Sequence, residues 1–116
     1  MKTASHMAAQ GDVLFRRIGT LPEGAKRIPH DGPLVVAHSE TGHHHVIDSP
    51  EVELYATADP LVSVLRIGAP FADVIHLRSF DTHETVRLLG NDDEPSFFEV
   101  RRQREHSFES WRIVND

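Results

Sequence analysis

The chain has 116 residues, of which 39% are hydrophobic, and its 12 basic and 18 acidic side chains give a net charge of −6. This apolar content suffices for one globular core and argues against intrinsic disorder. The acidic balance argues against a general nucleic-acid binder, and no apolar run reaches the roughly 18 residues of a membrane helix. The absence of cysteine excludes disulfides and thiol chemistry and, with no signal-peptide pattern at the start, favours a cytoplasmic protein.

The first seven residues, Met1–Met7, have the character of an expression leader. Ser5-His6-Met7 matches the residues that a common cloning site leaves behind. We therefore expect residues 1–7 to be a leader and residues 8–116 to form a single all-β domain.

Short runs of β-branched and aromatic residues recur along the chain, whereas helical periodicity is nearly absent. Their starts lie mostly about 8 to 12 residues apart, with Gly, Pro, Asn and Asp between them. This pattern predicts an all-β fold, a small barrel or sandwich of about eight or nine short, mostly antiparallel strands. Residues 19–33, rich in Pro and Gly, are expected to be a long connection. The predicted strands are Asp12–Ile18, Leu34–His38, His43–Ile47, Val52–Ala56, Leu61–Ile67, Asp73–Arg78, Thr85–Leu89, Phe97–Arg104 and Trp111–Val114.

Nine histidines are unusual for this length, and three of them stand in succession at 43–45. The runs Leu34–His38 and His43–Ile47 are joined by four residues, a length typical of a β-hairpin. A regular hairpin gathers three imidazoles on one otherwise apolar face, although a slip of one residue would exchange the two faces. The opposed pairs in that register are Leu34 with Ile47, Val36 with His45, and His38 with His43.

Three imidazoles at the turn end of a strand pair suit a metal site, because His-x-His places two ligands about 7 Å apart on one face. The segment Asp81–Glu84 offers a further imidazole and carboxylates from another strand. Histidines with a carboxylate suit Zn, or Fe or Mn if coordination positions stay open. The predicted metal ligands are His38, His43, His45, Asp81 and His83, and a divalent metal is the only cofactor expected.

Other roles for these histidines stay open. Histidine-rich turns also arise as solvated tips, as subunit contacts or as pH-responsive hydrogen-bond networks. His76 lies within a predicted strand, so we expect a satisfied core or half-exposed histidine there. His30 and His106 flank turns and are expected to be solvated.

Three arginines, Arg101, Arg102 and Arg104, follow the strand that begins near Phe97. Guanidinium groups this close together could hold a phosphate or a carboxylate. In an acidic chain they are expected instead to pair with the acids of residues 92–94 and with Glu105, or to cross a subunit interface. Trp111 is expected to dock the last strand on the core.

Two resemblances are visible. Gly42–His45 after a predicted strand resembles the first half of a cupin motif, which implies a metal in a small barrel. The later Glu of that motif is absent, since Ser49 and Pro50 stand there, and no second motif follows. Gly42–His45, Thr82–Glu84 and Glu99–Glu105 together resemble small uncharacterised β-rich proteins of bacteria and phage-derived loci. That resemblance groups the three segments and implies no reaction.

The leading interpretation is a small β-barrel-like protein with a histidine-lined pocket that binds a divalent metal or a small anionic ligand. A non-catalytic oligomeric interaction protein, whose histidines line a subunit contact, and a cupin-like metal-dependent enzyme are the alternatives. No catalytic residue is assigned, and no Gly-x-Ser-x-Gly elbow occurs. Many strand edges predict a homo-oligomer, most simply a dimer, with no membrane or nucleic-acid partner.

Overall fold

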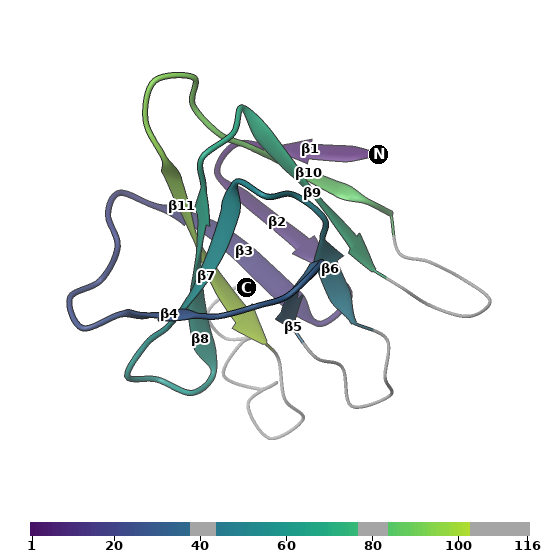
Figure 1. Cartoon of the computed structure of the whole chain (residues 1–116). Helices are drawn as coiled ribbons and strands as arrows, with labels where there is room; N and C mark the ends of the chain where they lie inside the picture. Colours follow the sequence, from purple (N-terminus) through teal and green to yellow (C-terminus); the bar gives the residue numbers. More distant parts are fainter. Residues whose placement is uncertain (38–43, 77–83, 103–116) are drawn as a thin grey trace.

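The computed structural model describes residues 1–37, 44–76 and 84–102. Within these ranges the chain forms strands and no helix, in one five-stranded and one six-stranded sheet (Figure 1). The all-β prediction is confirmed. The described residues contain no helix long and apolar enough to cross a membrane.

The five-stranded sheet carries the histidine hairpin. Its first pair is parallel, and the other neighbours are antiparallel. The strand order is β1 (Lys2–Ala4), β10 (Val86–Leu89), β9 (Phe71–His76), β6 (His45–Ile47) and β5 (Leu34–Ala37).

The six-stranded sheet is antiparallel throughout. Its strand order is β2 (Met7–Gln10), β3 (Val13–Ile18), β11 (Ser96–Arg102), β8 (Val62–Ile67), β7 (Val52–Ala56) and β4 (Lys26–Ile28).

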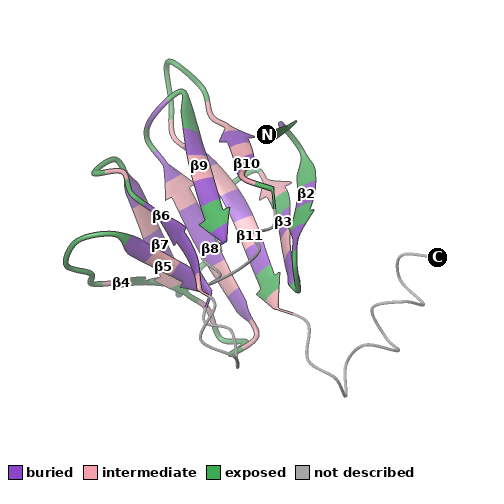
Figure 2. Cartoon of the chain, turned by 90° about the vertical axis from the view of Figure 1, so that its right-hand side faces the viewer, coloured by how far each residue is buried: buried purple, intermediate pink, exposed green. Residues whose placement is uncertain are grey.

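The core lies between the two sheets. One cluster of buried side chains joins Phe15, Leu65 and Phe98 of the six-stranded sheet to Val74 and Leu88 of the five-stranded sheet. Burial alternates along β11, as Figure 2 shows, because successive side chains point to opposite faces. The face of β11 that points into the core is therefore mainly apolar, and its other face carries charged residues.

Most predicted strands agree with the structure, and β7 has the predicted bounds. The long connection predicted at 19–33 is wrong, because β4 lies inside it and pairs with β7. Residues 1–7 form β1 and begin β2, while their origin as a leader stays a prediction. The predicted strand Trp111–Val114 lies outside the described residues.

The hairpin register is right at one end and wrong at the other. Leu34 lies opposite Ile47, as predicted. An irregularity between Val35 and Ala37 then places Ala37, not Val36, opposite His45. An extra residue in one strand shifts every later pair by one position. The predicted pair of His38 and His43 lies outside the described residues.

Candidate functional site

Two histidines stack in the interior at one end of the five-stranded sheet. His45 begins β6, and His76 ends the adjacent strand β9 directly opposite it. Their ring centroids are 4.0 Å apart and the ring planes differ by 14°. His45 is 0% exposed and His76 is 5% exposed, so of the two positions expected for His76, core or half-exposed, the structure has the core one. The strand pairing therefore brings the two rings together.

A buried amide from the other sheet holds the ring of His45. Gln10, the last residue of β2, is 2% exposed. Its Nε2 donates hydrogen bonds to the carbonyl oxygens of Val74, at 2.7 Å, and Glu84, at 3.0 Å. Its Oε1 lies 2.8 Å from Nδ1 of His45.

These three hydrogen bonds determine which ring nitrogen of His45 carries the proton. An amide nitrogen only donates and an amide oxygen only accepts. Because Nε2 of Gln10 is committed to two carbonyls, its Oε1 faces His45, and Nδ1 of His45 is the donor. In neutral His45 the lone pair therefore belongs to Nε2. Metal-binding histidines are commonly oriented by such a bond through the other ring nitrogen.

Asp12 supplies a carboxylate on the side of that lone pair. It lies in the two-residue turn between β2 and β3, where Gly11 has a φ of 59° and Gln10 pairs with Val13. A positive φ at the first turn residue is easily adopted by glycine and suits a tight hairpin. Oδ1 of Asp12 lies 3.4 Å from Nε2 of His45, and the Asp12 side chain is 51% exposed. The turn thus brings a solvent-accessible carboxylate to a buried imidazole.

The separation of these two atoms fits two ligands of one metal ion. Zinc–nitrogen and zinc–oxygen bonds of about 2.0–2.2 Å at a tetrahedral angle place the ligand atoms about 3.4 Å apart. Nε2 of His45 and Oδ1 of Asp12 have that separation. Residues 1–37, 44–76 and 84–102 contain no group of three or more His, Asp or Glu side chains that could hold a metal. The described residues therefore offer two candidate ligand atoms, Nε2 of His45 and Oδ1 of Asp12.

Of the predicted ligands, only His45 is among the described residues; His38, His43, Asp81 and His83 lie outside them. The described residues that flank these positions are close to His45. In the sheet, His45 lies between Ala37 of β5 on one side and His76 of β9 on the other. Gln10 joins His45 to the carbonyl oxygen of Glu84.

Gln10 and Asp12 were not among the predicted ligands. The signal for Gln10 is weak: a polar residue at a buried position, two residues after buried Ala8 in a short strand. His30 is exposed, as predicted, and its Nδ1 lies 2.9 Å from the carbonyl oxygen of Gly32. His106 lies outside the described residues.

A separate cavity of about 380 Å³ is lined by the end of β6, the residues that follow it, and residues in and just before β9. Phe71 and Ile75, two large side chains that are 43% and 40% exposed, line it together with Asp48 and Ser49. Because no histidine lines it, this cavity is not the histidine-lined pocket that the sequence predicts.

The fold and this site define a small β-rich, two-sheet domain with a buried histidine pair. A family model described as a domain of unknown function (DUF8820) matches residues 9–103, and the chain belongs to this family. Searches of curated proteins and of solved structures found no match. Membership agrees with the predicted kinship to small uncharacterised proteins, while the specific motifs and the cupin resemblance stay predictions.

Proposed function

We propose that this domain binds a divalent metal ion through Nε2 of His45 and the carboxylate of Asp12. The observation that carries this proposal is their separation of 3.4 Å, together with the Gln10 hydrogen bond that places the proton of neutral His45 on Nδ1. The further ligands would come from the predicted positions His38, His43, Asp81 and His83. Nitrogen and oxygen donors suit Zn, Fe or Mn.

The same geometry favours a metal over the other ligand class that the sequence suggested, a small anion. The half-exposed carboxylate of Asp12 faces the imidazole and would repel an anion approaching Nε2. A metal cation is attracted by the carboxylate of Asp12 and can also be coordinated by Nε2 of His45. Acid should weaken binding, because imidazole and carboxylate ligands must be deprotonated to coordinate a metal.

Calorimetric titration of chelator-treated protein with Zn²⁺ at neutral pH tests the proposal. We expect saturable binding of about one ion per chain, weakened on the order of 10-fold or more in Asp12→Asn, which loses a charged ligand but keeps its size. Asp31→Asn, a change at an exposed acid in another turn, is the matched control and should bind like the wild type. A flat wild-type trace, or unchanged binding by Asp12→Asn, would contradict the proposal.

A further inference from the structure

The outer face of the six-stranded sheet collects four arginines that are far apart in the sequence. They are Arg16 of β3, Arg27 of β4, Arg66 of β8 and Arg101 of β11, named here the arginine face. Their strand neighbours Phe15, Leu65 and Val100 lie in the core and Ile28 packs against it, so the alternation along each strand turns these arginines outward. This gathering of positive charge contrasts with the net charge of −6.

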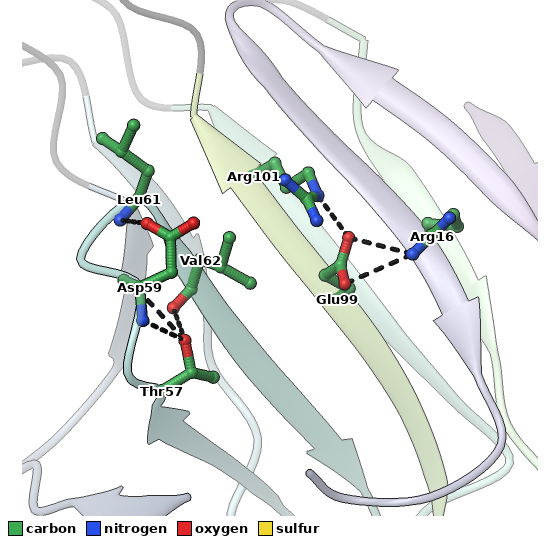
Figure 3. Close-up of polar contacts among 7 residues, drawn as sticks. All are labelled: Arg16, Thr57, Asp59, Leu61, Val62, Glu99 and Arg101. Carbon is green, nitrogen blue, oxygen red and sulfur yellow. Dashed lines mark hydrogen bonds and ion pairs between the residues drawn. The ribbon is translucent and has the colours of Figure 1, made fainter. Parts of the chain in front are cut away.

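Two glutamates lie among these arginines and leave the face positive. Glu99 makes ion pairs with Arg16, at 3.3 Å, and with Arg101, as Figure 3 shows. Glu53 makes ion pairs with Arg27 and Arg66, at 2.7 and 3.4 Å. Four cations and two anions leave 4 − 2 = +2.

The positive groups are also the more accessible ones. The four arginine side chains are 35–54% exposed, whereas Glu53 and Glu99 are 28% and 13% exposed. Asp59, in the turn between β7 and β8, makes no ion pair with these four arginines; its Oδ1 accepts a hydrogen bond from the backbone N–H of Leu61 at 2.9 Å (Figure 3). An approaching partner therefore meets guanidinium groups before carboxylates.

The acids that could match this charge lie in the turn between β10 and β11. Asp92, Asp93 and Glu94, named here the acidic turn, are all exposed and make no ion pair with other described residues. The sequence predicted that the C-terminal arginines pair with these acids and with Glu105, or cross a subunit interface. Within the chain Arg101 pairs with Glu99 instead of the acidic turn, and the subunit contact stays a prediction.

We propose that the arginine face of one copy of this chain binds the acidic turn of a second copy. The planar guanidinium group suits carboxylates, which it can bind with two parallel hydrogen bonds. Stacking two arginine faces directly on each other would oppose like charges, and a strongly negative nucleic acid is disfavoured by the acidic chain. The exposed acidic turn of a second copy is opposite in charge to the arginine face and belongs to the same acidic protein, so neither objection applies to it.

Light scattering at tens of micromolar protein, in chelator and at low salt, measures this association independently of the metal site. We expect a mass above one chain that falls toward one chain at 0.5 M NaCl, where screening reduces the contact. The turn variant Asp92→Asn, Asp93→Asn, Glu94→Gln should associate at least about 10-fold more weakly. The control Glu23→Gln, Asp31→Asn removes two exposed acids elsewhere and should associate like the wild type.

A face variant with glutamine in place of all four arginines should also be monomeric, with an unchanged circular dichroism spectrum. Mixing the face and turn variants should restore association, because each retains the surface that the other lacks. A monomeric wild type at low salt would overturn the proposal, as would association that survives in the turn variant. Binding of a labelled single-stranded oligonucleotide by a monomeric wild type, lost in the face variant, would assign the face to nucleic acid and equally overturn it.

Discussion

The buried amide of Gln10 should contribute strongly to stability, and Gln10→Met tests this most cleanly. Methionine has nearly the volume of glutamine, so the change removes three hydrogen bonds without opening a large cavity. Two of the partner groups, the carbonyl of Val74 and the ring of His45, are in residues that are 0% exposed, where water cannot readily replace the amide. The third partner, the carbonyl of Glu84, is in an exposed residue, where water can replace it.

Each buried polar group that loses its partner costs about 1–3 kcal/mol. Two such groups predict a loss of about 2–6 kcal/mol in the free energy of unfolding, a large share of the roughly 5–15 kcal/mol of a typical domain. Urea denaturation should show a lower midpoint with an unchanged m-value.

Ala9→Met places the same side chain on the exposed side of the same strand and serves as the control, with an expected change within about 0.5 kcal/mol. Equal destabilisation by Gln10→Met and Ala9→Met would contradict a stabilising role of the Gln10 amide.

Three further measurements test the fold and one ionisation. Gly90→Ala should destabilise the protein by about 1–3 kcal/mol in thermal denaturation, because a Cβ there would lie 2.2 Å from the carbonyl oxygen of Ala69. An unchanged stability would contradict this close approach of the two backbone segments. Phe98→Ala, in the core at 0% exposure, should cost about 3–5 kcal/mol, and a loss below about 1 kcal/mol would show that this ring is not in the core. Absorbance titration of Tyr55 should give a midpoint above 10.0, because burial and the hydrogen bond to Glu53 raise its pKa. The stability that the folded protein gains from keeping Tyr55 neutral is present at neutral pH and is lost as the pH rises through that midpoint. Glu53→Gln should lower the midpoint, and a wild-type midpoint at or below 10.0 would contradict the burial and hydrogen bond of Tyr55.

The sequence predicts the fold class well because the strands of this protein are amphipathic and are separated by residues typical of turns. Val52 and Leu54 alternate with polar residues between Pro50 and a polar turn, and the predicted strand agrees with β7. By contrast, β4 has only three residues, two of them charged, so that neither length nor alternation marks it. Its pairing with β7 is a tertiary effect that local pattern does not contain.

The candidate site is predictable only in part, and for physical reasons. A cluster of histidines identifies His45, but the irregularity between Val35 and Ala37 changes its cross-strand neighbour. Gln10 comes from the other sheet, 35 positions away in the sequence, and its role depends on two backbone carbonyls that no side-chain pattern encodes. Asp12 reaches the site because a tight turn follows Gln10.

The most direct test of the proposed metal site is long-range ¹H–¹⁵N NMR of the ring nitrogens of His45, before and after addition of Zn²⁺. When His45 is neutral in the metal-free protein, we predict a proton on Nδ1, which donates to Gln10, and an unprotonated Nε2. Zinc should shift the Nε2 resonance and leave the Nδ1 proton in place. A proton on Nε2 instead of Nδ1 in neutral His45, or unchanged His45 resonances while the protein takes up zinc, would contradict the proposed site.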